Sequence, residues 1–296
     1  MNRHDLTLSL AFIKRLFLDQ THIQGTPWNP WVKQTQLNPR IPLFLDRENE
    51  IIKYFRIPRY WLWGCYLQKG FPNTLRFKRN LQQYFQERTA SHLLKEAYHE
   101  ASFYYALRLM MAFERYSMVL DYLEAFYKFR GKERKSLRGW TVLDFGCGVS
   151  DIGLLLSLLG ATVEICDLAD QKLNFAQWRY QVRNLKVAVI PQNAVDQPPV
   201  LESEKYDLII AKEVFEHLTD PLQNLQALTR SLRPQGLLFN SMGENGHRDI
   251  GGDHLEKAMR IMKSQEYQSF YRRHYHPVYF SRNQNFLFQL EDPFRP

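Results

Sequence analysis

The sequence lacks the features expected of a membrane-spanning or disulfide-stabilised protein. It contains no run of about eighteen apolar residues, so no segment predicts a membrane-spanning helix. The only cysteines are Cys65, Cys147 and Cys166, and an odd count does not suggest a disulfide framework. An early acid, Asp5, followed by further charges, makes the N-terminus a poor signal peptide. We therefore expect a reduced, cytoplasmic protein that does not bind a membrane.

Internal repeats and low-complexity segments are also absent. With 296 residues, 45% of them apolar, the chain can bury one large or two small cores. Its net charge of +8 is uneven, because residues 1–139 carry 23 Lys and Arg against 12 Asp and Glu, and residues 140–296 carry 16 against 19. The basic first part makes a nucleic acid a candidate partner, although a solvated basic face is the simpler interpretation.

The pattern of the chain changes near residue 140. Before it, prolines interrupt an aromatic-rich stretch, and apolar residues then recur at helical spacing over residues 93–129. After it, short β-favouring runs alternate with helical segments, which is typical of a mostly parallel sheet with helices on both faces. We predict an α/β fold in which residues 1–139 form a mainly helical N-terminal cap or substrate-binding region and residues 140–296 form a cofactor-binding domain.

The second part of the chain predicts a regular series of elements. The expected strands cover residues 141–145, 162–166, 187–190, 207–211 and 237–241, followed by two shorter β-like stretches at 278–281 and 286–290. The expected helices cover residues 150–159, a segment that ends near 183, residues 221–232, and one helix from about 253 to 271.

The most informative segment runs from the end of the first expected strand to the helix expected from Ser150. It contains, in order, Asp144, Gly146, Cys147 and Gly148. Glycines let a backbone approach a ligand closely, and the N–H groups of a helix N-terminus favour an anionic group. The spacing is G-x-G-x4-G and not the G-x-G-x-x-G of dinucleotide-binding proteins. The segment resembles motif I of class I S-adenosylmethionine-dependent methyltransferases, in which D-x-G-x-G holds the methionine half of the cofactor.

Two segments downstream match the same family pattern in order. Asp167 closes the second strand, 19 residues after Gly148. The resemblance implies that its carboxylate, followed by Leu168, accepts hydrogen bonds from the ribose hydroxyls, whereas its alternative role is to cap the next helix. Asn193 and Ala194 stand where the family usually has Asp-Ala beside the adenine. An amide oxygen can still accept a hydrogen bond from the adenine amino group, and a turn asparagine is the alternative.

A third segment follows the fourth strand and reads E-x-x-E-H-L-x-D-P from Glu213 to Pro221. It looks like motif IV and its helix in small-molecule methyltransferases such as the quinone O-methyltransferases. The resemblance implies that Lys212 contributes to the cofactor site and that the acidic and imidazole groups lie near the transferred methyl group. Glu213 and His217 are the expected catalytic residues, which act as bases where the acceptor must lose a proton.

The same spacing supports a metal hypothesis. In small-RNA 2′-O-methyltransferases E-x-x-E-H resembles a magnesium site, and here the ligands would be Glu213, Glu216 and His217, completed by His254 or His247. The pattern is widespread in methyltransferases without a metal, so a divalent metal is the less favoured interpretation. Residues 243–256, which carry the two downstream histidines, are expected to wall the acceptor site or to form a surface loop.

The resemblance implies a Rossmann-like, seven-stranded-type sheet and transfer of a methyl group from S-adenosylmethionine to oxygen or nitrogen of a small molecule. Three alternatives stay open. An RNA methyltransferase would use the basic N-terminal region, a non-methylating enzyme would transfer the aminocarboxypropyl arm or cyclise the cofactor, and a non-enzymatic subunit would only bind the cofactor. A dehydrogenase is disfavoured by the glycine spacing. The oligomeric state stays open.

Overall fold

The computed structural model describes residues 43–62, 137–192, 197–241, 254–280 and 285–291, together with Gly64, Phe103 and Ala106. The strands in these residues are β1 (Thr141–Phe145), β2 (Thr162–Leu168), β3 (Ala188–Gln192), β4 (Tyr206–Ala211), β5 (Leu232–Ser241), β6 (Tyr275–Phe280) and β7 (Asn285–Leu290). All seven correspond to stretches expected from the sequence. β5 begins at Leu232 and not at residue 237 as expected, and the other strand ends differ by three residues or fewer.

The helices of the second half are α8 (Asp151–Leu158), α9 (Gln171–Gln181), α10 (Pro221–Ser231), α11 (Glu256–Met262) and α12 (Gln265–His274), and a 3-10 turn, η1 (Phe215–His217), precedes α10. The expectation of a single helix over residues 253–271 is wrong. The Ser264 hydroxyl accepts a hydrogen bond from the Tyr267 N–H and begins α12, so the chain forms two helices.

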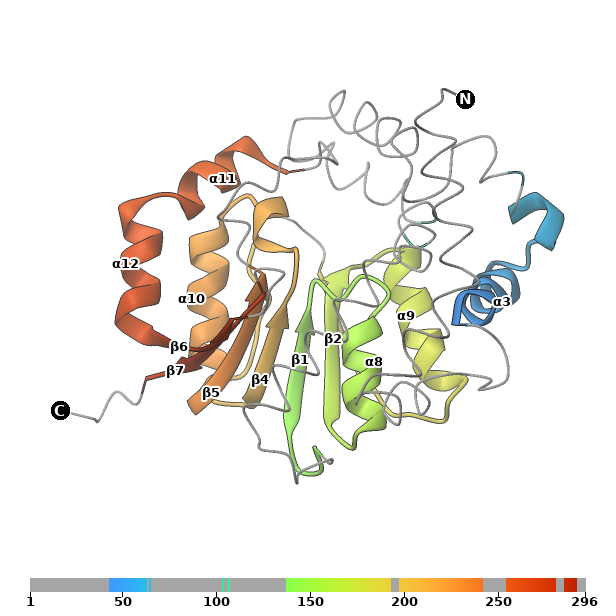
Figure 1. Ribbon diagram of the computed structural model, residues 1–296, viewed down its shortest axis with the longest axis horizontal. Helices are drawn as coiled ribbons and strands as arrows, with labels where there is room; N and C mark the ends of the chain where they lie inside the picture. The colour runs from blue at the N-terminus through green and yellow to red at the C-terminus, as the bar shows by residue number, and fades with distance from the viewer. Residues whose placement is uncertain are drawn as a thin grey trace.

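The described strands form one sheet in the order β3-β2-β1-β4-β5-β7-β6 (Figure 1). The strands β1 to β5 are paired in parallel, and β7 pairs antiparallel with both β5 and β6. This arrangement confirms the α/β fold class and the mostly parallel, seven-stranded sheet with helices.

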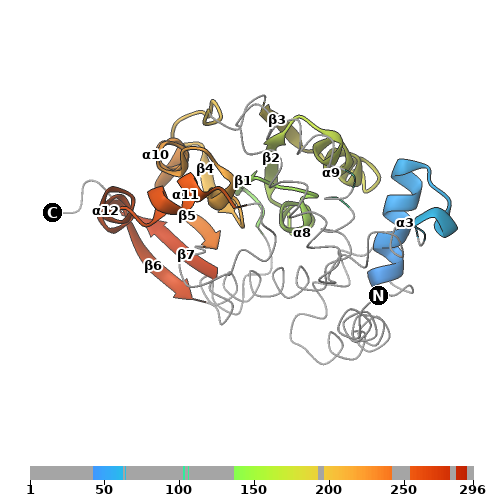
Figure 2. The same ribbon diagram turned by 90° about the horizontal axis from the view of Figure 1, so that it is seen from above.

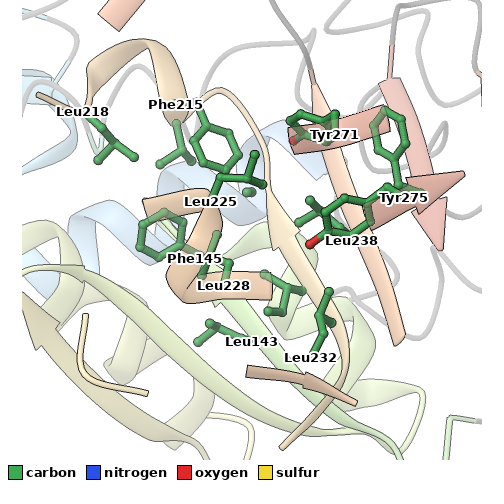
Figure 3. Packing of buried hydrophobic residues seen from close by; sticks show 14 of the residues in the cluster. Leu143, Phe145, Phe215, Leu218, Leu225, Leu228, Leu232, Leu238, Tyr271 and Tyr275 are labelled. Atoms are coloured by element: carbon green, nitrogen blue, oxygen red, sulfur yellow. The ribbon is translucent and has the colours of Figure 1, made fainter. Parts of the chain in front are cut away.

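Helices cover the sheet on both faces (Figure 2). Successive side chains of a strand point to opposite faces, so Val142 joins the core under α8 and α9, whereas Leu143 and Phe145 join the core under α10, α11 and α12. Figure 3 shows this second core, in which leucines of α10 and β5 meet the rings of Phe215 and Tyr271. Each fully buried side chain of this size contributes roughly 1.5–3 kcal/mol. The alternation also places Asp144 on the α8 and α9 side.

One N-terminal helix, α3 (Leu43–Phe55), lies beside α9 (Figures 1 and 2). In the sequence it lies between Pro42 and Pro58, two of the prolines that interrupt the aromatic-rich N-terminal stretch. The rest of the expected helical cap lies outside the described residues, apart from helical Phe103 and Ala106 and a short helical stretch after Pro58. No described helix is long and apolar enough to cross a membrane.

Candidate functional site

The expected site residues gather at the carboxyl ends of three neighbouring strands. Asp144 lies near the end of β1, Asp167 near the end of β2, and Lys212 directly after β4. Because β1 pairs with both β2 and β4, these ends lie side by side. In open parallel sheets the ligand crevice lies outside the carboxyl ends of the strands, at the point where the strand order reverses. Here that point is β1, between β2 and β4.

The glycine loop is tied to β2 and presses against the segment that follows β4. The N–H groups of Gly146 and Cys147 donate to the Cys166 carbonyl over 2.8 and 3.1 Å. Gly146 has a φ of 63° and Gly148 a φ of 58°, both in the left-handed region that favours glycine. A Cβ on Gly146 would collide with the Val214 side chain. The close approach that requires this glycine is therefore a contact within the protein, between two segments of the site.

Asp144 lies under the glycine loop in a buried polar network. Its Oδ2 accepts hydrogen bonds from the Ser150 hydroxyl at 2.7 Å and from the Gly153 N–H at 3.2 Å, and Ser150 Oγ lies 3.0 Å from the Tyr180 hydroxyl. Burial raises the pKa of Asp144 to about 7, although the Ser150 hydrogen bond opposes this shift. These contacts hold the loop to α8 and α9, and a direct contact of Asp144 with the cofactor stays a prediction.

Asp167 joins the glycine loop to β2. Its Oδ2 accepts from the Gly148 N–H at 2.7 Å, and its Oδ1 accepts from the Leu168 N–H at 2.7 Å and from Lys172 Nζ at 2.9 Å. The alternative role as a helix cap belongs to Asp170, whose Oδ1 accepts from two N–H groups at the start of α9. The Asp167 carboxylate is thus left to face the glycine loop.

Lys172 is a site residue that the sequence analysis missed. Its side chain is buried, and Nζ pairs with Asp170 at 3.2 Å as well as with Asp167. Burial opposes the charge of Lys172, but the two carboxylates more than offset this, so its pKa is raised. A D-x-x-D-x-K pattern across the start of a helix was the available signal, because a cation buried there needs acidic partners.

The segment after β4 forms an irregular turn before the helix that the sequence predicts over residues 221–232. Glu213 has a φ of 54°, η1 follows, and α10 begins only after Asp220, whose Oδ1 accepts from the Gln223 N–H at 2.9 Å. Lys212 is buried, and its Nζ lies 3.7 Å from Glu213 Oε1. The catalytic candidates Glu213 and His217 therefore sit on an irregular turn beside the glycine loop, since Val214 lies between them and contacts Gly146.

Glu216, His217 and His254 form a cluster in which one potential ligand atom from each lies within 4.8 Å of the others. Glu216 Oε1 is 4.0 Å from His217 Nε2, and the two imidazole rings are 5.2 Å apart between centroids. The cluster is fixed because the Leu255 N–H donates to the Glu216 carbonyl at 2.9 Å. Glu213 is not part of this set, so three of the four expected metal ligands come together.

Glu216 Oε2 is buried and has no hydrogen-bond partner among the described residues. Burial raises the pKa of Glu216, the imidazole of His217 lowers it, and the charge of Glu213 raises it again. An unsatisfied buried carboxylate oxygen is costly, which points to a proton, a water or a cation at this position. The other candidates, Asn193, Ala194 and His247, lie outside the described residues.

Residues 143–240 match the family model described as a methyltransferase domain. The chain is 30% identical over 125 residues to the ubiquinone biosynthesis O-methyltransferase of Actinobacillus pleuropneumoniae, which covers 41% of this chain and 50% of the relative. It is 33% identical over 109 residues to the enzyme of the same name from Pseudomonas savastanoi, and this match covers 37% of this chain and 47% of the relative. The chain thus spans about half the length of the curated relatives it matches.

A solved structure of an S-adenosylmethionine-dependent methyltransferase from Aquifex aeolicus is also similar, at 22% identity and a TM-score of 0.41, over 56% of this chain and 86% of that one. The sheet is mostly parallel, and a hydrogen bond joins the glycine loop to Asp167. The residues that match the methyltransferase domain family extend from β1 to β5. Residues 143–240 are therefore similar to the methyltransferase domain family, and the fold agrees with the resemblance to class I S-adenosylmethionine-dependent methyltransferases. The methyl donor of this family is S-adenosylmethionine.

Proposed function

We propose that this protein transfers the methyl group of S-adenosylmethionine to a hydroxyl oxygen of a small molecule. The observation that carries the proposal is the hydrogen bond between the Gly148 N–H and Asp167 Oδ2, which joins the glycine loop to the acid of β2 at the carboxyl end of the sheet. The curated relatives named as O-methyltransferases support oxygen as the acceptor atom.

The residues present suit this cofactor. Each oxygen of a carboxylate can accept about two hydrogen bonds, and Asp167 Oδ2 has one described donor, so it retains capacity for a ribose hydroxyl. Leu168, Asn193 and Ala194 would line the adenosyl end, while Asp144, Cys147 and Lys212 would lie at the methionine end. S-adenosylmethionine supplies a methyl group already activated on a sulfonium. The chain therefore has mainly to position the acceptor and exclude water.

His217 is the candidate that we favour as the general base. It is partly buried beside the Glu216 carboxylate, at 4.0 Å between Nε2 and Oε1, and a neighbouring carboxylate stabilises an imidazolium. Its role would be to take the proton of the acceptor hydroxyl as the oxygen is methylated. Glu213, whose side chain is more exposed, would orient the acceptor from the other side of Val214.

A second candidate role for this part of the site is metal binding by Glu216, His217 and His254. The observation in its favour is the 4.8 Å cluster together with the unsatisfied buried Oε2 of Glu216. Two imidazoles and one carboxylate suit Zn²⁺ or another first-row transition ion better than Mg²⁺, which prefers oxygen ligands. A bound ion would supply Lewis acidity for the acceptor hydroxyl.

The primary test is calorimetry of the purified protein with S-adenosylhomocysteine, followed by incubation of S-adenosylmethionine with a panel of phenols, amines and RNA. We expect one-to-one binding and formation of S-adenosylhomocysteine in step with a methylated phenol. Absence of binding would refute the proposal. Release of methylthioadenosine would support transfer of the aminocarboxypropyl arm of the cofactor. Methylation of RNA, with RNA binding that weakens steeply as salt is added, would support the RNA alternative.

Substitution of His217 and His254 distinguishes a general-base role of His217 from a metal-binding role of the cluster. If His217 is only a base, His217→Ala lowers kcat by about 100-fold or more, whereas His254→Ala has a small effect and added Zn²⁺ none. If the cluster binds Zn²⁺, both variants lose one equivalent of bound metal, and a chelator lowers the activity of the wild type alone. Metal content by mass spectrometry and kcat therefore decide between the two roles.

A further inference from the structure

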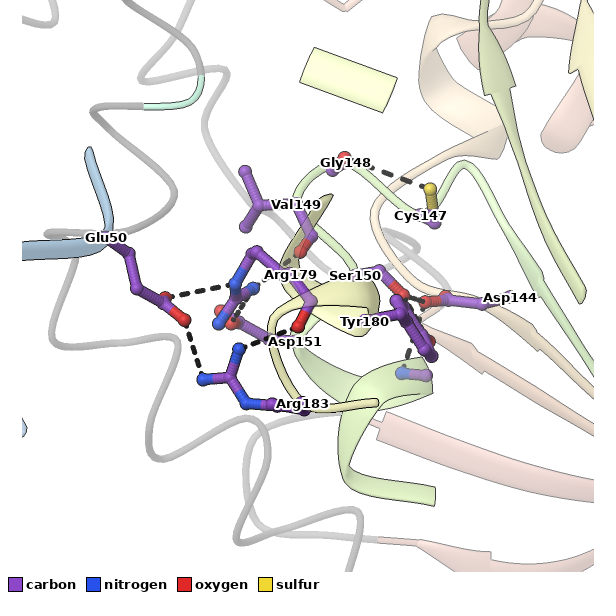
Figure 4. Close-up of polar contacts among 11 residues, drawn as sticks. Glu50, Asp144, Cys147, Gly148, Val149, Ser150, Asp151, Arg179, Tyr180 and Arg183 are labelled. Carbon is purple, nitrogen blue, oxygen red and sulfur yellow. Dashed lines mark hydrogen bonds and ion pairs between the residues drawn. The ribbon is translucent and has the colours of Figure 1, made fainter. Parts of the chain in front are cut away.

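Helix α9 holds the end of the glycine loop through two consecutive residues. Arg179 Nη1 donates to the Val149 carbonyl and lies 2.8 Å from Asp151 Oδ1. Tyr180 places its hydroxyl 3.0 Å from Ser150 Oγ. Figure 4 shows these contacts on successive residues of the loop. The backbone that leads from the glycines into α8 is thus fixed by α9 and not by α8 alone.

Arg179 is in turn bound by α3, a helix more than a hundred residues earlier in the chain. Glu50 Oε2 accepts from Arg179 Nε at 3.1 Å, and Glu50 Oε1 accepts from Arg183 Nη2 at 2.6 Å (Figure 4). Glu50 is 2% exposed and Arg179 is 3% exposed. Buried charges of this kind depend on their partners, because a charge left alone in the interior carries a large desolvation cost. The orientation of Arg179 therefore depends on Glu50.

Aromatic contacts hold the two helices in register around this ion network. The ring of Tyr54 lies 5.0 Å from Phe175 and 5.4 Å from Trp178, and Phe55 lies 5.5 Å from Phe175, between ring centroids. Phe175 is also 6.0 Å from the Arg179 guanidinium. Such packing restricts how α3 can move on α9, so the carboxylate of Glu50 meets Arg179 in one geometry.

We propose that Glu50 is a positioning residue for cofactor binding, which couples the docking of α3 on α9 to the shape of the glycine loop. The inference rests on the proposed cofactor site. The contacts that carry this coupling run from Glu50 through the Arg179 guanidinium to the Val149 carbonyl and Asp151. Because coupling is reciprocal, a cofactor that favours the ordered loop also strengthens the docking of α3.

The alternative role of the network is to stabilise the fold without affecting the cofactor. The two roles differ in measurable ways. A structural role lowers the melting temperature but leaves the cofactor affinity of the folded protein unchanged. A positioning role raises the KM for S-adenosylmethionine and the Kd for S-adenosylhomocysteine under conditions where every variant is fully folded, and leaves kcat nearly unchanged.

The test uses the full chain with Glu50→Gln, which keeps the size of the side chain and removes its charge. Arg183→Gln serves as a milder second variant, because it removes one partner of Glu50 and leaves Arg179 in place. The matched control is Arg233→Gln. It breaks an ion pair with Asp207, at 2.8 Å, near the amino end of β4 and away from the glycine loop.

We expect Glu50→Gln to raise the Kd for S-adenosylhomocysteine about five- to tenfold by calorimetry, Arg183→Gln to raise it less, and Arg233→Gln to leave it unchanged. We also expect S-adenosylhomocysteine to slow amide hydrogen exchange in α3 of the wild type. An equal Kd for S-adenosylhomocysteine in Glu50→Gln, Arg183→Gln and wild type would overturn the inference. Amide hydrogen exchange in α3 that is the same with and without the ligand would also overturn it. A wild type that binds no S-adenosylhomocysteine would instead overturn the proposed function.

Discussion

Replacement of Gly146 by alanine tests why this position is glycine. The new Cβ would collide with both Cγ atoms of Val214, and the residue would keep a φ of 63°. The left-handed conformation costs a residue with a Cβ roughly 1–2 kcal/mol, and overpacking costs about 1–3 kcal/mol more. We therefore expect Gly146→Ala to lower the free energy of unfolding by about 2–5 kcal/mol.

A second substitution separates the two costs. Val214→Ala removes the two methyl groups that collide and by itself costs about 1–2 kcal/mol of buried apolar contact. The double variant should be more stable than the sum of the single effects predicts, by about 1 kcal/mol or more, because the collision is gone and only the backbone cost remains.

Denaturant unfolding of the four proteins, with calorimetry of S-adenosylhomocysteine on each, measures this coupling. If Val214 is what excludes a side chain at Gly146, the double variant also regains part of the cofactor affinity that Gly146→Ala loses. Additive stability effects, or a well-folded double variant that still fails to bind, would show that the ligand and not Val214 requires the glycine.

Two further predictions concern the buried acids. Because Asp144 has a pKa raised to about 7 in the folded state, its ionisation opposes folding, and stability should fall as pH rises from about 4 to about 7, by up to about 4 kcal/mol. Asp144→Asn should flatten this dependence in denaturant midpoints, and an unchanged slope would contradict it. Asp167→Asn should weaken S-adenosylhomocysteine binding about 10- to 100-fold through loss of a charged acceptor. Its control, Asp170→Asn, keeps a capping side chain and should bind S-adenosylhomocysteine as the wild type does. Because Lys172 pairs with both acids, an equal loss of affinity in the two variants would mean that the effect acts through Lys172.

The motifs and the main elements were predictable from local patterns. Strands β1, β2 and β4 are parallel and largely buried, and each contains apolar or β-branched residues at most of its buried positions, which is the local signal of a strand. Asp170 and Asp220 begin helices as local hydrogen-bond acceptors. The break between α11 and α12 was not predicted, because residues 256–274 contain no glycine or proline that would mark the end of a helix.

Local sequence patterns were enough to predict the succession of strands and helices along the chain, the glycine loop, and the acids near the ends of β1 and β2, because these features depend on neighbours within a few residues. Which distant side chains meet depends on the assembled fold. His254, which the sequence offered as one possible ligand, lies with Glu216 and His217, whereas Glu213 lies outside this cluster. Glu50 meets Arg179 across more than a hundred residues, and nothing in the sequence pointed to this pair. Such contacts carry no local signal, since a buried charge finds its partner only after the sheet and its helices have assembled.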